Sequence, residues 1–486
     1  MTETKIETKN TESREAAQFN KMINTPVWKL ISKLAVPTII SMLITGIYNM
    51  ADTYFVSKLG TEASAAVGIM FPVMNIIQAC GFTLGMGSAS LISRKLGERK
   101  DKEASLIAST AFFAAILVGL FISLFCLIFK SGLMRLVGAS ETILPFAVEY
   151  STFIFLGAPF MCASFVLNNI LRSEGKATSS MIALSTGGIL NIFLDPIFIF
   201  TFGLGIRGAA IATFLCQITS FLILLSFFLR KQTICSLNPS HIFKTKKNEK
   251  SETANPVIAV SAFAVLWTVI CTGFPSLCRQ GLSSFATILL NRAAGNFGDD
   301  AAIAGMAIVT RVVMLIASVM IGIGQGFSPV CGYNYGAKRY DRVRHAFRFT
   351  VISSFLLLFA FSAVIWIFAP EVVKSIRNDP AVIKVGATAL KSQLCLMPFH
   401  SIIITTNMLM QSTGHVKAAT FLSCNRQGIF FIPVILILPH FIGILGVELT
   451  QTIADALSTL AAIPYIFWFF KKIKKIEKDS VSEISH

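Results

Sequence analysis

The sequence predicts an all-α integral membrane protein with twelve transmembrane helices in two six-helix repeats. Of its 486 residues, 54% are hydrophobic and only 14% are charged, whereas soluble domains carry about 25% charged residues. Apolar segments of about 20 residues recur from Leu30 to Phe470, and this is the length that a helix needs to cross the hydrocarbon layer. A closed barrel would instead show alternating segments of about ten residues.

Hydropathy and charge place the spans and their orientation. Lys and Arg gather in the even-numbered loops and in both tails, so the positive-inside rule places both termini in the cytoplasm. The net charge of +17 is therefore a topology signal, and nucleic acid is not an expected partner. The predicted spans are 28–55, 62–90, 104–129, 147–171, 177–201, 206–229, 257–290, 301–331, 346–369, 386–411, 417–438 and 444–470.

The second half of the chain repeats the first. Pro37 falls on Pro275 at an offset of 238, and Asn168 falls on Asn407 at an offset of 239. Six helices per repeat is an even number, so both copies enter the membrane from the same side, as in many transporters. The expected parts are a cytoplasmic N-terminal tail 1–27, an N-lobe 28–229, a cytoplasmic linker 230–256, a C-lobe 257–470 and a basic cytoplasmic tail 471–486.

Two acids lie well inside spans of the first half, Asp52 and Asp195. Asn191 lies four residues before Asp195, so both side chains project from one face of the fifth helix. Pro196 lacks an amide hydrogen and leaves a carbonyl free one turn earlier, and Thr213 of the sixth helix offers a hydroxyl. Pro196, and Pro37 in the first helix, are expected to bend their helices because proline removes a backbone donor, and each shares its helix with one of the two in-span acids.

These oxygens predict a site for a proton or for a small hard cation such as Na⁺. A charged Asp at the bilayer centre costs about 2.5–3.5 kcal/mol on insertion scales, so a function must offset that cost. The sequence does not decide between the two ions. The structural alternative is that each Asp only hydrogen-bonds a neighbouring helix.

The second half lacks this pair. Leu290 occupies the position of Asp52 in the repeat, and Val434 or a near neighbour occupies that of Asp195. Asp455 is the main alternative coupling acid. His400, His415 and His440 form no metal pattern and are interpreted as interface or loop residues. The other in-span charges of this half either pair with acids, line a wet cavity or reach toward an interface, and they are Arg279, Arg311, Lys391 and Arg426.

No enzyme motif is present. The glycines of residues 81–90 lie on a helix and lack the strand and turn of a phosphate-binding loop, and no nucleophile-base-oxyanion set or Walker motif occurs. The ten cysteines form no metal-like or C-x-x-C spacing. We therefore expect neither an enzyme nor a cofactor.

The repeat, Pro37 with GIYNMADTYFV (46–56), Asn168 and NIFLDP (191–196) resemble the MATE multidrug efflux transporters, and the likeness covers about residues 28–470. Within that family the chain is most similar to the bacterial MepA-type subgroup, near the DinF-like branch. The resemblance implies a V-shaped inner-membrane antiporter that exports cationic, partly aromatic drugs in exchange for H⁺ or Na⁺.

By motif, the resemblance assigns cation or proton coupling to Asp52, Asn191, Asp195 and Thr213, and lining of the drug cavity to Tyr48 and Asn168. The chain departs from the NorM-type pattern of an acid pair in the seventh and tenth helices, where it offers Arg279 and Lys391. Small drugs and membrane lipid are the expected partners of a monomer. The alternative function is a flippase for lipid-linked oligosaccharides, which shares the general architecture.

Overall fold

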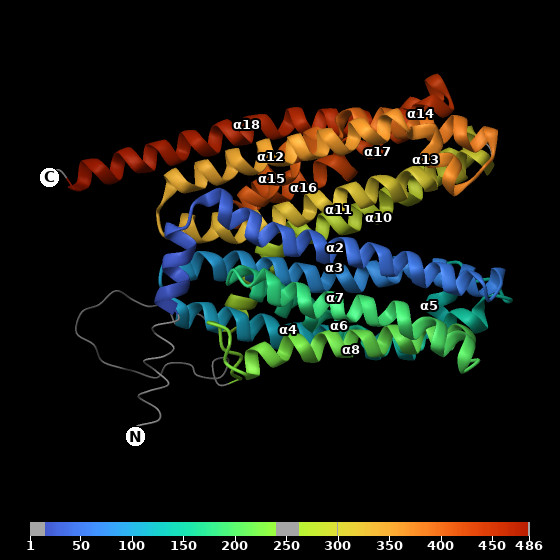
Figure 1. Cartoon of the computed structure of the whole chain (residues 1–486), viewed down its shortest axis with the longest axis horizontal. Coiled ribbons are helices and arrows are strands. Elements are labelled where there is room, and N and C mark those ends of the chain that lie inside the picture. The colour runs from blue at the N-terminus through green and yellow to red at the C-terminus, as the bar shows by residue number, and fades with distance from the viewer. Residues whose placement is uncertain (1–14, 240–261, 299, 485–486) are drawn as a thin grey trace. The chain divides into compact units, whose positions relative to one another are not determined.

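The computed structural model describes residues 15–239, 262–298 and 300–484, and every regular element in these ranges is a helix (Figure 1). Within them, 12 helices are long and apolar enough to cross a membrane, and each predicted span falls on one. The all-α membrane fold is thereby confirmed. The ends of both predicted tails, most of the predicted linker and the start of the seventh predicted span lie outside the described residues.

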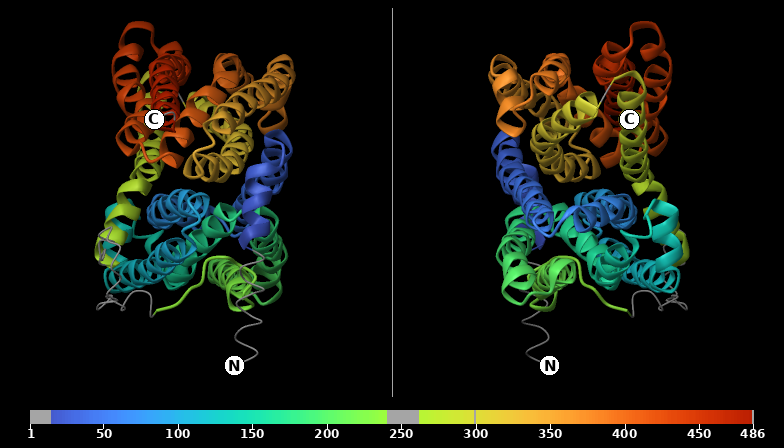
Figure 2. Two further views of the ribbon diagram at one scale, coloured as in Figure 1. Left: turned by 90° about the vertical axis from the view of Figure 1, so that its left-hand side faces the viewer. Right: turned by 90° about the vertical axis from the view of Figure 1, so that its right-hand side faces the viewer.

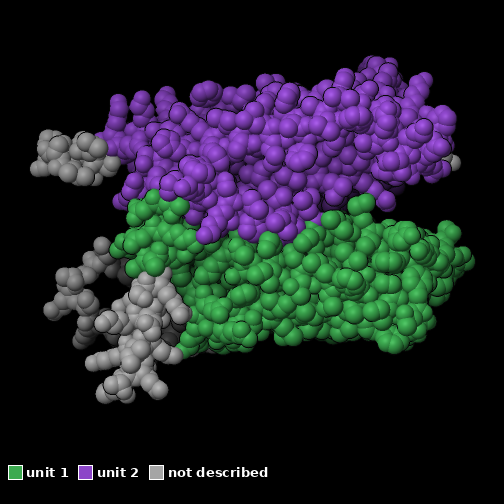
Figure 3. Space-filling model, viewed as in Figure 1, with its two compact units in different colours: residues 1–25, 44–277 green, residues 26–43, 278–486 purple. Residues whose placement is uncertain are grey.

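The helices form two compact units (Figure 3). Unit 1 comprises residues 1–25 and 44–277, and unit 2 comprises residues 26–43 and 278–486. Helices α2 (Val27–Ser57) and α10 (Ala262–Phe297) each contribute one part to each unit. The lobe boundaries drawn from the sequence follow chain order and stay a prediction.

Unit 1 is a bundle whose helices are seen end-on in Figure 2. The buried face of α6 is the most extensive, with its span window 83% buried inside the protein, so α6 forms the centre of this bundle. Besides parts of α2 and α10, the unit contains α3 (Thr61–Gly97), α4 (Asp101–Ile128), α5 (Lys130–Val137), α6 (Leu144–Ser173), α7 (Ala177–Pro196), η1 (Ile197–Thr201) and α8 (Gly205–Leu229).

Unit 2 has a core of hydrophobic residues that includes Leu290, the repeat counterpart of Asp52. Besides parts of α2 and α10, it contains α11 (Asp300–Gly336), α12 (Tyr340–Ile367), α13 (Ala369–Ile376), α14 (Pro380–Leu396), η2 (Met397–Phe399), α15 (His400–Ser412), α16 (Val416–Cys424), η3 (Asn425–Ile429), α17 (Phe431–Ile442) and α18 (Ile444–Ile484).

Two short helices were not predicted, and neither was the form that the helices take at three irregular turns within the spans. The short helices α5 and α13 lie in corresponding loops of the two repeats, 239 residues apart at their starts. Several spans also depart from the α-helix: η1 is a π-turn directly after Pro196, η2 is a 3₁₀ turn around Pro398, and η3 is a π-turn with no proline. Proline explains the first two because it removes a backbone donor.

Glycines allow close helix contact at equivalent places in the two units. In unit 1, a Cβ on Gly273 of α10 would overlap the Thr83 carbonyl of α3. In unit 2, a Cβ on Gly326 of α11 would lie 2.7 Å from the Ala35 backbone of α2. Small residues at such contacts let backbones approach closely in membranes. The part of α10 in unit 1 and the part of α2 in unit 2 thus pack against backbone atoms at these glycine contacts.

Gly273→Ala should therefore destabilise the protein by about 1–3 kcal/mol, because the added methyl group meets backbone that cannot rotate away. Thermal unfolding in detergent measures the effect. Gly281→Ala on the same helix is the matched control, since a Cβ there meets nothing within 4 Å. Equal melting temperatures for the two variants would contradict the close contact between Gly273 of α10 and the backbone of α3.

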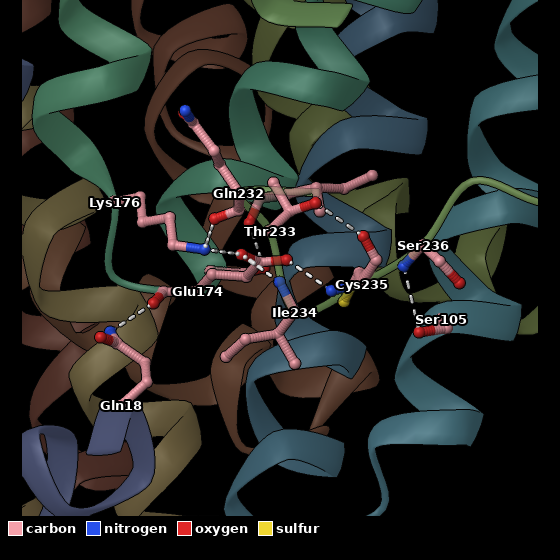
Figure 4. Close-up of polar contacts among 11 residues, drawn as sticks. Gln18, Ser105, Glu174, Lys176, Gln232, Thr233, Ile234, Cys235 and Ser236 are labelled. Carbon is pink, nitrogen blue, oxygen red and sulfur yellow. Dashed lines mark hydrogen bonds and ion pairs between the residues drawn. The ribbon is translucent and has the colours of Figure 1, made fainter. Parts of the chain in front are cut away.

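The segment that follows α8 is fastened to unit 1 by Glu174 in the turn between α6 and α7 (Figure 4). The Glu174 side chain is fully buried and accepts hydrogen bonds from the backbone amides of Ile234 (3.0 Å) and Cys235 (2.8 Å). Lys176 pairs with the same carboxylate at 2.8 Å. Gln18, in the helix of residues 15–24, donates to the Glu174 carbonyl at 2.6 Å, so one turn holds both this helix and the start of the linker.

The reactivity of the Cys235 thiol measures how firmly Glu174 holds this segment. Its side chain is fully buried, and burial, together with the neighbouring Glu174 carboxylate, raises the pKa of the thiol well above its usual range. The thiolate is the reactive form, so Cys235 should resist maleimide at neutral pH. Glu174→Gln removes the charge that holds the segment and should speed the labelling of Cys235 about tenfold, which corresponds to about 1.4 kcal/mol of easier opening.

Peptide mapping of the labelled protein by mass spectrometry distinguishes Cys235 from the other thiols. Glu141→Gln is the control, because the Glu141 side chain is 80% exposed and forms only a surface pair with Arg135. If Cys235 is labelled rapidly in the unaltered protein, Glu174 does not hold this segment.

Candidate functional site: buried acids in unit 1

Three of the four residues predicted to bind the coupling ion meet between α7 and α8. Asn191 donates through Nδ2 to Asp195 Oδ1 at 3.0 Å, and more weakly to Thr213 Oγ1 at 3.4 Å. Asp195 is fully buried and Asn191 is 2% exposed. The four-residue spacing of Asn191 and Asp195 on α7 thus produces the contact that the sequence predicts.

Asp52 belongs to the same unit, on the part of α2 that follows residue 43. It lies close enough to the Asp195 carboxylate and the Tyr48 hydroxyl to interact electrostatically with both. The Tyr48 ring packs against Gly188, three residues before Asn191, with a ring carbon 3.0 Å from where a Cβ would be. Asp52 and Tyr48 are therefore brought to the face of α7 that carries Asn191 and Asp195.

Tyr150 of α6 is a further member that sequence reasoning missed. Its side chain is 1% exposed, and it interacts electrostatically with Asp52, Asp195 and Tyr48. Tyr150 lies near the start of a predicted span, where tyrosine usually marks the membrane interface. Its burial beside two acids could not be read from that position.

The oxygens of this cluster are incompletely paired. Asp52 Oδ1, Asn191 Oδ1 and Asp195 Oδ2 are buried atoms without a hydrogen-bond partner in the described chain. Buried polar groups nearly always have partners, so unpaired ones point to a role or to a bound water or ion. No basic side chain of the described residues forms an ion pair with Asp52 or Asp195. This donor-poor set of oxygens suits a proton or a hard cation.

Asn168 is not brought to this cluster. Its Nδ2 donates to Ser180 Oγ at 2.6 Å, joining α6 to α7. Ser180 precedes Asp195 by fifteen residues, which is about 22 Å along a helix. Its repeat counterpart Asn407 likewise bonds the residue twelve positions later, donating to the Ala419 carbonyl at 2.7 Å. The shared geometry favours helix joining for both amides, and the drug-binding role of Asn168 stays a prediction.

The two prolines predicted to bend helices lie in different units. Pro196 ends α7 directly after Asp195 and is followed by the π-turn η1, so the helix geometry changes next to the acid. Pro37 lies inside the continuous helix α2, in the part assigned to unit 2.

Unit 2 contains a second buried polar cluster of different chemistry. Asp455 on α18 accepts from Arg426 Nε at 2.7 Å and from Gln451 Nε2 at 2.9 Å, and it pairs with His400 Nε2 at 2.8 Å. His400 is 1% exposed, so its interpretation as an interface or loop residue is wrong. The missed signal was an ionisable side chain inside a predicted span. Arg426 pairs with an acid, one of the options left open for it.

Comparisons with known proteins agree with this architecture. The family model MatE matches residues 37–197 and 275–437, two stretches at the offset of the internal repeat. The chain is 26% identical to "Multidrug export protein MepA" of Staphylococcus saprophyticus over 442 residues, 91% of this chain and 94% of that protein. It is also 26% identical to the MepA protein of Staphylococcus aureus strain NCTC 8325 over 444 residues, with the same coverage.

Solved structures give the same result. A crystal structure of MATE in complex with MaL6 superposes with a TM-score of 0.85 at 27% identity, covering 94% of this chain and 99% of that one. An outward-facing multidrug resistance MATE transporter of the MOP superfamily gives 0.84 at 28% identity, covering 94% and 98%. The chain therefore belongs to the MatE family, and it is a multi-pass membrane transporter rather than an enzyme.

Proposed function

We propose that this transporter exports amphipathic, cationic drugs across the bacterial cytoplasmic membrane in exchange for inward movement of H⁺ or Na⁺. The observation that carries the proposal is the set of unpaired buried oxygens on Asp52, Asn191 and Asp195, with no basic partner in the described chain. Relatives that cover nearly the whole chain are named multidrug export proteins, which supports drugs as the exported class.

Coupling follows from the charge of this cluster. Two neighbouring carboxylates in a medium of low polarity repel each other, and a bound proton or cation relieves that repulsion. Asn191 holds one oxygen of Asp195, while the other remains open to the ion. Occupied and empty clusters therefore favour different arrangements of the helices around them, and alternation between inward and outward access is the resulting population shift.

Drug and ion bind antagonistically in this scheme. A cationic drug is stabilised in a cavity lined by the empty, negative cluster, and ion binding removes that attraction. By reciprocity of coupling, the drug weakens ion binding by the same factor. Both termini lie in the cytoplasm, as the distribution of the basic residues favours, and the protein acts as a monomer.

Drug uptake into inverted membrane vesicles tests the function and identifies the ion. The two gradients are imposed separately. A fluorescent cationic drug should accumulate under the gradient of the coupling ion, H⁺ or Na⁺, and collapse of that gradient should release the drug. Vesicles without the transporter give the background. Equal accumulation with and without the transporter under both gradients would refute drug-ion exchange.

A further inference from the structure

The last helix carries a stripe of lysines directly in line with its lipid-facing side. Leu460 and Phe467 are 63% and 72% exposed on α18, as expected of side chains that face lipid tails. Continuing at helical spacing of three or four residues, the same face presents Lys471, Lys474 (with Lys475 beside it) and Lys478, all exposed. We call Lys471, Lys474, Lys475 and Lys478 the lysine stripe.

The opposite side of this segment packs against its own unit. Phe469 is fully buried and Ile473 is 1% exposed. Phe470 contacts Phe347 of α12, and Glu477 pairs with Arg344 at 3.1 Å. The segment is therefore held in place, and the stripe has a fixed direction. Figure 1 shows α18 continuing past the end of α12 at this end of unit 2.

The depth of the stripe matches the headgroup layer. Trp468, 46% exposed, lies where the apolar face ends, as is usual at a membrane interface. At 1.5 Å per residue, Lys471 to Lys475 lie about 5–11 Å beyond Trp468 along the axis. The headgroup layer adds about 5–8 Å to each side of the hydrocarbon core. The first lysines therefore lie at the level of lipid phosphates, on a face already turned toward lipid.

The repeat shows that this charge is not a general property of the fold. At the repeat offset of 239, residues 471–478 correspond to residues 232–239, which contain no lysine or arginine.

We propose that the lysine stripe binds the phosphate groups of anionic phospholipids at this end of unit 2. Basic residues next to a span attract anionic headgroups, and each neutralised lysine should weaken the attraction about fivefold. The nearby acids do not cancel this charge, because Glu477 is held by Arg344 and Asp479 is a single carboxylate beside four lysines. The inference depends on the chain spanning a bilayer and not on drug transport.

The test uses the full-length protein in vesicles of phosphatidylglycerol and phosphatidylcholine, extracted in mild detergent, with retained lipid quantified by mass spectrometry. The unaltered protein should retain phosphatidylglycerol over phosphatidylcholine. The variant Lys471→Gln/Lys474→Gln/Lys475→Gln/Lys478→Gln should lose at least tenfold of this preference, and Arg at all four positions should keep it.

Four lysines of unit 1 form the matched control, since Gln at Lys58, Lys100, Lys102 and Lys231 removes the same charge from another place. This control should keep the preference. An undiminished preference in the stripe variant would overturn the proposal, as would an equal loss in the unit 1 control. A third outcome would also overturn the proposal. If a soluble acidic polymer bound the protein through the stripe, and added phosphatidylglycerol did not compete, the partner would be a macromolecule rather than lipid.

Discussion

Asp195→Asn should abolish gradient-driven drug accumulation, lowering the initial rate at least 100-fold, while the folded protein remains in the membrane. Asparagine has the same shape and still accepts from Asn191, whose bond to Asp195 Oδ1 is 3.0 Å long. It cannot take up a proton or attract a cation with a full charge. Asp52→Asn should act in the same way, because Asp52 interacts with Asp195 in the same cluster. Uptake into inverted vesicles provides the rate.

A second measurement separates lost coupling from lost folding. Thermal unfolding of Asp195→Asn should stay within about 1 kcal/mol of the unaltered protein, since no ion pair is broken. Asp341→Asn is the control acid, because the Asp341 side chain is 58% exposed and forms only a surface pair with Arg339; it should transport normally. Full gradient-driven export by either cluster variant would exclude these acids from coupling.

Asp455→Asn should have the opposite profile, with a large loss of stability. The substitution leaves Arg426 and His400 facing a neutral amide in a buried site, where Arg426 now bonds Asp455 at 2.7 Å. Breaking a buried ion pair from one side typically costs about 3–5 kcal/mol. Thermal unfolding in detergent should show this loss, whereas transport per folded molecule should persist.

The double variant Asp455→Asn/Arg426→Gln provides the internal check. Removing both charges leaves no unpaired ion, so the double variant should be more stable than Asp455→Asn alone. If Asp455→Asn instead left stability unchanged and stopped transport, Asp455 would be a coupling acid and the role of unit 2 would need revision.

Hydropathy and repetition predicted most of the fold, because a membrane span is a sum over about 20 residues and tolerates local exceptions. Hydropathy summed over about 20 residues could not reveal α5 and α13, which are only eight residues long. Nor could chain order show that α2 and α10 divide between the units. That division depends on contacts such as Gly273 against Thr83, which join residues distant in sequence.

The candidate site was predictable where one helix supplies two groups. Asn191 and Asp195 meet because four residues make about one turn. Tyr150 and His400 were missed because their partners come from other helices. Asn168 was assigned to the drug cavity by resemblance, and this role stays a prediction; its amide bonds Ser180. Spacing within a helix is visible in a sequence, whereas the direction in which neighbouring helices face is decided by packing.

Helices α2 and α10 each place one part in the unit built mainly from the other repeat, so each unit depends on both repeats. Residues 26–43 belong to the unit built mainly from the second repeat, and residues up to 277 of α10 belong to the unit built from the first. Each unit therefore takes one helix part from the other repeat. If the gene were cut between residues 239 and 262, each fragment would lack a helical piece that only its counterpart can supply, so the two products should be recovered together or not at all.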